Sequence, residues 1–287
     1  MYEIIDVNNS LNLRTQVYDK ESRLRTAPGY DGDPVDNGHN THWVWRTDKL
    51  GLIMASQAAG MKTSPKGGFV LHNNAVEMEY LIEGECDLSY PGDRHVLFRV
   101  GDCLCHQPGQ PHCMKAITPH RLYIAVMLSC APGACDRTEY RGESNIKTVD
   151  SWQVKTCSEV KAELSDEGKV ETRNIYENNE HPISHRVITL KPGGSYPAQG
   201  FNACNVDEYY YVVSGQGVAR YPEKAYGLYH QITLYNYQGQ PFKYVNTGKE
   251  DLVILSVSAV TKFADLKYDI VENPLVSYEL PAIPAKN

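Results

Sequence analysis

The chain has 287 residues, of which 41% are hydrophobic and 22% are charged, and its formal net charge is −7. These values are typical of a globular protein long enough for one large all-β domain or two medium ones. The negative charge argues against nucleic acid or an anionic membrane as the main partner. The longest apolar run, Leu122–Cys130, is too short to span a bilayer.

The first residues carry acidic side chains, Glu3 and Asp6, where a signal peptide needs positive charge. We therefore expect a cytoplasmic protein, with residues 1–40 forming an N-terminal arm. In that compartment the eight cysteines would stay reduced. No CxxC pair occurs, so the thiols are interpreted as small apolar side chains.

Strand patterns dominate the chain. Short runs rich in aromatic and β-branched residues are separated by Gly, Pro and Asp, which is typical of an all-β fold. In the first half these runs are residues 50–58, 76–90, 95–107 and 120–130. The second half repeats the scheme with HRVITLKPGGSYPAQG, DEYYYVVSGQGVARY, YHQITLYNY and DLVILSVSAV. Between the halves, Glu159–Gly168 is the only segment that resembles a helix or a linker.

The two halves share an internal repeat. In the first half Glu77 is followed after six residues by Gly84, in EMEYLIEG, and in the second Glu208 is followed after six residues by Gly215, in EYYYVVSG. A repeat period of more than a hundred residues indicates two duplicated domains rather than a solenoid.

Two motifs carry a resemblance to a known family. Gly101 is followed by DCLCH, then by QPG at 107–109, two further residues and His112, while Glu77 precedes Gly84 at the matching spacing. In this the sequence resembles the cupin superfamily, and specifically a bicupin. The resemblance implies two tandem jelly-roll β-barrels. We place cupin domain 1 at residues 41–140, a linker at 141–170, cupin domain 2 at 171–265 and an extended C-terminal tail at 266–287.

The first motif allows two registers. If Glu77 is the family's glutamate, His72 stands at the second histidine of the HxH pair and Val70 replaces the first. If His72 is the first histidine, Asn74 replaces the second and Glu79 becomes the carboxylate. The six-residue spacing to Gly84 favours Glu77, because that glycine fixes the turn between strands.

The resemblance implies a metal site in the first barrel, with His72, Glu77 and His112 as ligands. Two histidines and one carboxylate are the ligand set of non-haem Fe(II) oxygenases. We therefore expect one divalent ion, with Fe(II) favoured and Mn, Ni or Zn as alternatives. In the second barrel Glu208 remains, but FNAC at 201–204 lacks a histidine and Phe242 stands where the other ligand would fall. That barrel is predicted to have lost its metal.

Other residues are predicted to serve the same site. Alternation along a strand places Glu77 and Glu79 on one face, and Val70, His72 and Asn74 on another. Glu79 and Asn74 are the candidate catalytic residues, as proton carriers or groups that orient a substrate. His106 and Cys105 are the candidate substrate-binding residues. A role supporting a metal ligand is the alternative for His106 and packing in the barrel wall the alternative for Cys105.

The leading functional hypothesis is a mononuclear non-haem Fe(II) dioxygenase that acts on a small organic substrate. The first alternative is a non-redox isomerase, lyase or hydrolase that uses Zn, Mn or Ni, with Glu79 transferring a proton. The second is a cupin that binds a small molecule without converting it. No nucleic-acid or membrane partner is expected, and family habit suggests a homodimer.

Overall fold

The computed structural model describes residues 2–6, 16–18, 24–26, 39–46, 49–57, 59–64, 67–117, 119, 122–129, 137–222 and 224–272. In this part of the chain the elements are β-strands and three short 3-10 helices, with no α-helix. The all-β class predicted from the sequence is thereby confirmed. No helix in these ranges is long and apolar enough to cross a membrane.

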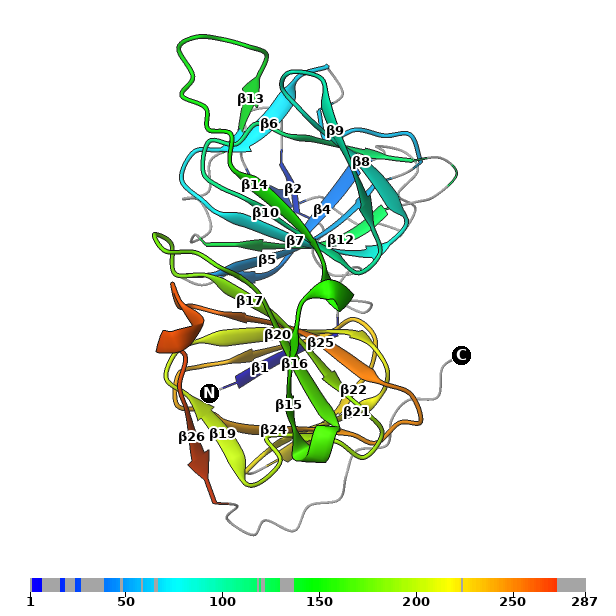
Figure 1. Cartoon of the computed structure of the whole chain (residues 1–287), viewed down its shortest axis with the longest axis vertical. Helices are drawn as coiled ribbons and strands as arrows, with labels where there is room; N and C mark the ends of the chain where they lie inside the picture. Colours follow the sequence, from blue (N-terminus) through cyan, green and yellow to red (C-terminus); the bar gives the residue numbers. More distant parts are fainter. Residues whose placement is uncertain are drawn as a thin grey trace. The chain divides into compact units, whose positions relative to one another are not determined.

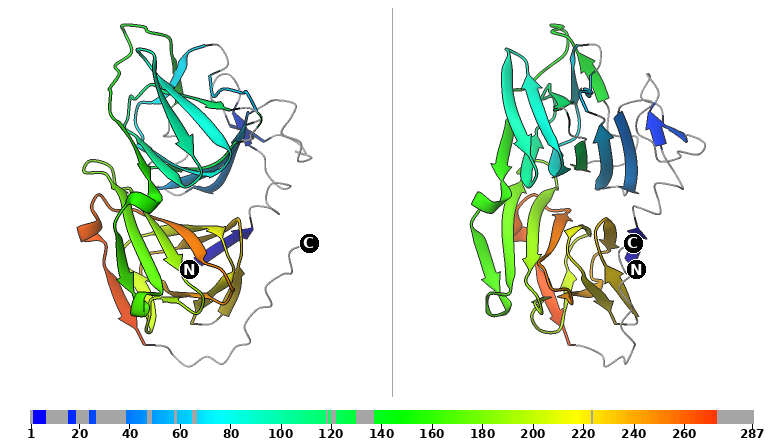
Figure 2. Two further views of the ribbon diagram at one scale, coloured as in Figure 1. Left: turned by 45° about the vertical axis from the view of Figure 1, so that its right-hand side comes forward. Right: turned by 90° about the vertical axis from the view of Figure 1, so that its right-hand side faces the viewer.

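Contacts divide the chain into two units. One unit is Asn8–Glu159, and the other combines Met1–Val7 with Val160–Asn287. Each unit is a β-sheet folded over on itself around an apolar interior (Figures 1 and 2).

The first unit has strands β2 to β14. Its main sheet has the order β14-β10-β7-β12-β5-β4, and smaller sheets are β11-β8-β9, β13-β6 and β2-β3. The strands are β2 (Gln16–Tyr18), β3 (Leu24–Thr26), β4 (His39–Arg46), β5 (Gly51–Gln57), β6 (Phe69–His72), β7 (Glu77–Glu83), β8 (Glu85–Tyr90), β9 (Arg94–Arg99), β10 (Asp102–His106), β11 (Cys113–Ala116), β12 (Leu122–Leu128), β13 (Arg137–Tyr140) and β14 (Trp152–Thr156).

The second unit contains β1 and the strands from β15 onward. Its main sheet has the order β1-β23-β20-β25-β17-β16-β15, and a second sheet has the order β22-β21-β24-β19-β26, with β18 also paired to β24. The strands are β1 (Tyr2–Asp6), β15 (Ala162–Ser165), β16 (Val170–Glu177), β17 (Ser184–Leu190), β18 (Ser195–Tyr196), β19 (Phe201–Cys204), β20 (Glu208–Ser214), β21 (Gly217–Tyr221), β22 (Lys224–Leu228), β23 (Ile232–Asn236), β24 (Pro241–Asn246), β25 (Leu252–Ser258) and β26 (Tyr268–Val271). The second unit also contains the 3-10 helices η2 (Asp166–Gly168) and η3 (Phe263–Asp265), while η1 (Cys157–Glu159) ends the first unit.

The segments expected to be an arm, a linker and a tail contribute strands. Strand β14 pairs with β10, and β15 pairs with β16, so the linker expected at 141–170 extends both sheets. From the arm, β1 pairs with β23, and from the tail β26 pairs with β19. Residues in β15 are largely exposed, which is why their polar sequence resembles a linker. The proline-rich part of the tail, from residue 273, lies outside the described residues.

The core of the first barrel fixes which strand faces point inward. Leu81 on β7 and Leu104 on β10 are fully buried in one apolar cluster. Side chains two residues apart on a strand share a face, so Glu79 and His106 must also point into this barrel. Polar groups carried there are removed from water and need partners.

Candidate metal centre

Two carboxylates lie at the start of β7, inside the first barrel. Glu77 is 7% exposed and Glu79 is 0% exposed. Neither Glu79 oxygen has a hydrogen-bond partner, and Oε2 of Glu77 has none. Burying carboxylates in this way is costly unless a positive charge or a proton compensates them.

Three imidazoles surround the Glu77 carboxylate. Nε2 of His72, at the end of β6, lies 3.6 Å from Glu77 Oε1. Nε2 of His112 lies 3.2 Å and Nδ1 of His106 lies 3.7 Å from Glu77 Oε2. His106 is directly opposite Glu77 in the β10–β7 pairing, and opposite residues of an antiparallel pair share a face. The backbone of His112 pairs with that of Val70 on β6, which places His112 next to this strand.

Hydrogen bonds orient two of these rings. Nδ1 of His112 lies 3.0 Å from the backbone oxygen of Gln110. A carbonyl only accepts, so Nδ1 carries a proton, and Nε2, the nitrogen nearer Glu77, is the one left to bind a metal ion when the ring is neutral. Nε2 of His106 lies 3.1 Å from the Tyr90 hydroxyl, while its Nδ1 has no hydrogen-bond partner. The His106 and His112 rings are stacked, with centroids 3.8 Å apart.

The cluster fits a divalent metal ion. Glu77, Glu79, His106 and His112 each offer a ligand atom within 4.8 Å of the others, and all four residues are buried. Glu77 Oε2, both Glu79 oxygens and His106 Nδ1 are buried without a hydrogen-bond partner, which is unfavourable unless a cation lies among them. Imidazole nitrogens and carboxylate oxygens together suit Mn, Fe, Ni, Co or Zn.

Burial and charge shift the titration of these groups in different directions. Burial alone would raise the pKa of Glu77, but His72, His106 and His112 hold it well below its ordinary value. The pKa of Glu79 is raised by burial and then by the Glu77 charge. Burial lowers the pKa of His106 to about 3, and the neighbouring His112 adds to the decrease. His106 is therefore neutral at pH 7 and able to act as a ligand.

The structure brings together most of the residues predicted from the sequence. Both His72 and His112 lie close to the Glu77 carboxylate. Glu79 lies in one cluster with Glu77 and His112. His106 lies among the potential ligands rather than at the margin, which favours a ligand role over the predicted contact with substrate.

Two predicted residues lie elsewhere. Asn74 is exposed in the turn between β6 and β7. Cys105 lies on the face of β10 opposite to His106, because adjacent residues of a strand alternate, and its sulfur accepts a hydrogen bond of 3.6 Å from the Gln107 side chain. The geometry thus gives neither residue a place inside the cluster.

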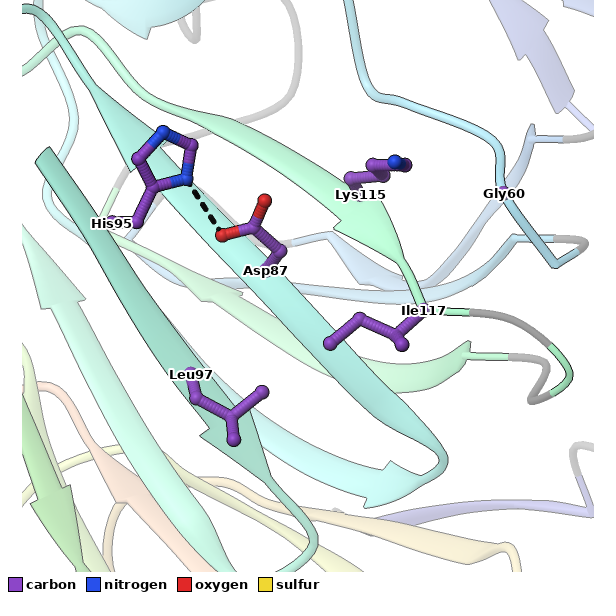
Figure 3. A pocket seen from close by; sticks show the side chains of 6 residues that line it. All are labelled: Gly60, Asp87, His95, Leu97, Lys115 and Ile117. Atoms are coloured by element: carbon purple, nitrogen blue, oxygen red, sulfur yellow. Dashed lines mark hydrogen bonds and ion pairs between the residues drawn. The ribbon is translucent and has the colours of Figure 1, made fainter. Parts of the chain in front are cut away.

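A surface hollow of about 560 Å³ lies on the outside of the same barrel, with Asp87, His95, Leu97 and Lys115 among its lining residues (Figure 3). Asp87 alternates on β8 with Cys86 and Leu88, which are buried in the core, so its side chain points outward. Nδ1 of His95 lies 2.9 Å from Asp87 Oδ1. This exposed pair is separate from the histidines and carboxylates inside the barrel.

The equivalent place in the second barrel holds a different polar network. Glu208 lies opposite Asn236 and Ser258 in its sheet, as Glu77 lies opposite His106 and Leu128. Arg186 Nη2 donates to Glu208 Oε1 at 2.9 Å, and the hydroxyls of Ser258 and Tyr210 also donate to the carboxylate. Within the described residues, no metal-capable group is found in this barrel.

Two jelly-roll barrels in one chain, with a buried histidine and carboxylate cluster in the first, define the fold as that of a bicupin. Solved structures agree. Protein Ylba from E. coli has a TM-score of 0.62 and 11% identity, with 91% of each chain covered. A Pseudomonas aeruginosa protein that bears the name "Putative Glyoxylate Induced Protein" has a TM-score of 0.61 and 14% identity, over 79% of this chain and 81% of that one.

A variant of the Bacillus subtilis oxalate decarboxylase has a TM-score of 0.59 and 12% identity, over 81% of this chain and 74% of its own. That decarboxylase has Mn(II) centres. No protein-family model and no curated sequence matches the chain. At these identities the likeness establishes the fold and leaves the reaction to be argued from the site.

Proposed function

We propose that this protein is a metal-dependent enzyme that performs proton-transfer chemistry on a small organic substrate in its first barrel. Glu77, His72, His106 and His112 would hold the ion. The observation that carries the proposal is the convergence of buried polar atoms that have no hydrogen-bond partner, namely Glu77 Oε2, His106 Nδ1 and both Glu79 oxygens. A divalent cation offsets the cost of burying them.

Manganese is the first candidate for the ion. Imidazole and carboxylate ligands accept Mn(II), and the oxalate decarboxylase of the same fold has Mn(II) centres. The preference for Fe(II) in the sequence analysis rested on a ligand set of only two histidines and one carboxylate. The third imidazole beside Glu77, that of His106, weakens that argument.

Each residue has a role that its geometry supports. When bound, the ion supplies a Lewis acid that polarises an oxygen of the substrate. Glu79, in the cluster and without a hydrogen-bond partner, exchanges a proton with the reacting group. The Gln110 backbone oxygen and the Tyr90 hydroxyl hold the rings of His112 and His106, so that the nitrogens facing Glu77 stay in place.

An Fe(II) dioxygenase is the second candidate. The observation in its favour is that His72 and His112 lie near the two oxygens of Glu77 and with it make a set of two histidines and one carboxylate. This candidate requires His106 to stay out of the coordination sphere.

Metal content tests the proposal first. The wild-type protein, His112→Phe and Glu79→Gln are stripped with a chelator, reloaded with Mn(II), Fe(II) or Zn(II), and measured by elemental analysis. We expect about one ion per chain in the wild type and in Glu79→Gln, and none in His112→Phe, since a phenyl ring cannot replace the coordinating imidazole. A wild-type chain that retains no ion would contradict the proposal.

Turnover distinguishes the reaction classes. Small hydroxy and keto acids are screened for conversion under nitrogen and in air. Conversion under nitrogen that falls about 10²- to 10⁴-fold in Glu79→Gln supports proton transfer. Conversion that requires dioxygen would favour the dioxygenase, and binding of these compounds without conversion would indicate a binding protein.

A further inference from the structure

Arg137 begins strand β13 and lies directly opposite His72 in the β13–β6 pairing. Opposite residues of an antiparallel pair point to the same face, with Cβ atoms about 4.5–5.5 Å apart. His72 uses this face to reach Glu77, with Nε2 3.6 Å from Oε1. The side chain of Arg137 therefore lies on the face of the β6–β13 ribbon that is turned toward Glu77.

The guanidinium group is held by a backbone carbonyl. Arg137 Nη2 donates to the backbone oxygen of Thr63 at 2.8 Å, and the residue as a whole is exposed. Burial of the guanidinium lowers the pKa of Arg137, and the Glu77 carboxylate is the strongest of the charges that oppose this decrease. Arg137 is thus a cation between solvent and the metal-competent cluster.

The second barrel provides an internal comparison for this position. Tyr268 begins β26 opposite Cys204, as Arg137 begins β13 opposite His72. The Tyr268 hydroxyl donates to Glu208 Oε1 at 2.7 Å. A side chain at this place therefore reaches the glutamate of its barrel when it is a tyrosine, and an arginine at the same place is long enough to extend toward Glu77.

Formal charges in the first barrel favour an anionic ligand. The ionised Glu77 offsets one of the two charges of a divalent ion, and Arg137 adds one positive charge, whereas the raised pKa of Glu79 keeps that group from balancing the rest. A guanidinium binds planar carboxylates through paired N–H donors, which an ammonium or amide group does not reproduce.

We propose that Arg137 binds a carboxylate group of the substrate, so that the substrate of the first barrel is a small organic acid with a second oxygen directed at the ion. This inference rests on the proposed function, because it needs the ion in place. In this role Arg137 determines substrate specificity, and it is not a ligand of the ion.

The test uses the full chain loaded with Mn(II). Glycolate and its neutral amide, glycolamide, are titrated while the Mn(II) EPR line shape and the relaxation of water protons are recorded. We expect the wild type to bind glycolate at least tenfold more tightly than glycolamide. Arg137→Gln should lose that preference while its Mn(II) content stays unchanged, and Arg137→Lys should retain part of it.

Arg141→Gln is the matched control, because it removes the same charge from the turn that follows β13, where Arg141 pairs with Glu139 at 3.4 Å. It should bind glycolate as the wild type does. The inference is overturned if Arg137→Gln keeps the preference, or if Mn(II)-loaded wild type shows none. Loss of Mn(II) from the wild type itself would instead refute the proposed function.

Discussion

Arg186 and Glu208 form a buried ion pair in the second barrel, with Nη2 and Oε1 2.9 Å apart and side chains 6% and 0% exposed. Glu208 has the same register position as Glu77 of the first barrel. The second barrel thus keeps the glutamate and compensates it with a guanidinium and hydroxyl groups. A fixed side-chain cation there leaves no charge for a metal ion to neutralise.

Removing Arg186 should destabilise the protein strongly. In Arg186→Met the Glu208 carboxylate stays buried without its cation, and we expect a loss of about 3–5 kcal/mol in the free energy of unfolding. The double variant Arg186→Met with Glu208→Gln should recover part of that loss, since no uncompensated charge remains. Urea denaturation measures both, and equal destabilisation of the single and double variants would show that the ion pair is not the cause.

His106 and Cys105 are neighbours on β10 and provide a matched pair of substitutions. In the second barrel the position equivalent to His106 is occupied by Asn236. His106→Asn therefore introduces a side chain that the same place in the fold already accepts. We expect this change to weaken Mn(II) binding about 10- to 100-fold. Cys105→Ala, on the opposite face of the strand, should leave it unchanged. Competition with a chelator gives both affinities, and the reverse order would restore Cys105 to the site.

The acid stability of the second barrel should depend on His185. This histidine is 0% exposed, neither ring nitrogen has a hydrogen-bond partner, and burial together with the charge of Arg186 lowers its pKa from 6.5 to about 3. As the pH falls through that interval, the unfolded chain gains a proton that the folded chain does not. The folded state therefore loses stability, by about 1.4 kcal/mol per pH unit for this one group.

His185→Phe tests that dependence because it removes the titrating group and keeps an apolar ring. Between pH 6.5 and 3 its free energy of unfolding should fall less steeply than that of the wild type, by one proton's contribution. The half-buried His181→Phe is the control for the loss of an imidazole elsewhere in the same barrel. An unchanged slope in His185→Phe would show that His185 is not buried as a neutral ring.

The sequence contained enough to predict the fold class and part of the centre. The repeated spacing from Glu77 to Gly84 and from Glu208 to Gly215 predicted two barrels, and both barrels are present. Spacing also predicted that His72, Glu77 and His112 would come together. These residues lie near one another in the chain or in a motif of fixed length, so the local sequence pattern is enough to predict that they meet.

The sequence did not predict a ligand role for His106 or the contact of Arg186 with Glu208, because both depend on pairing between strands. His106 faces Glu77 only because of the β10–β7 register, and Arg186 meets Glu208 across β25. A register between strands is set by the whole sheet, and one sequence does not determine it. One signal was present: Cys105 and His106 are adjacent on a strand, so that only one of them could line the interior.

The pairing of β1 with β23 links Tyr2–Asp6 to Ile232–Asn236, across most of the chain. During synthesis on the ribosome, β1 emerges before β23 and can pair with it only after more than two hundred further residues have been translated. The segment from Asn8 to Glu159, which contains the metal-competent barrel, is complete well before that. Assembly in the order of translation would therefore finish the barrel that holds the histidines before the barrel that encloses the arginine.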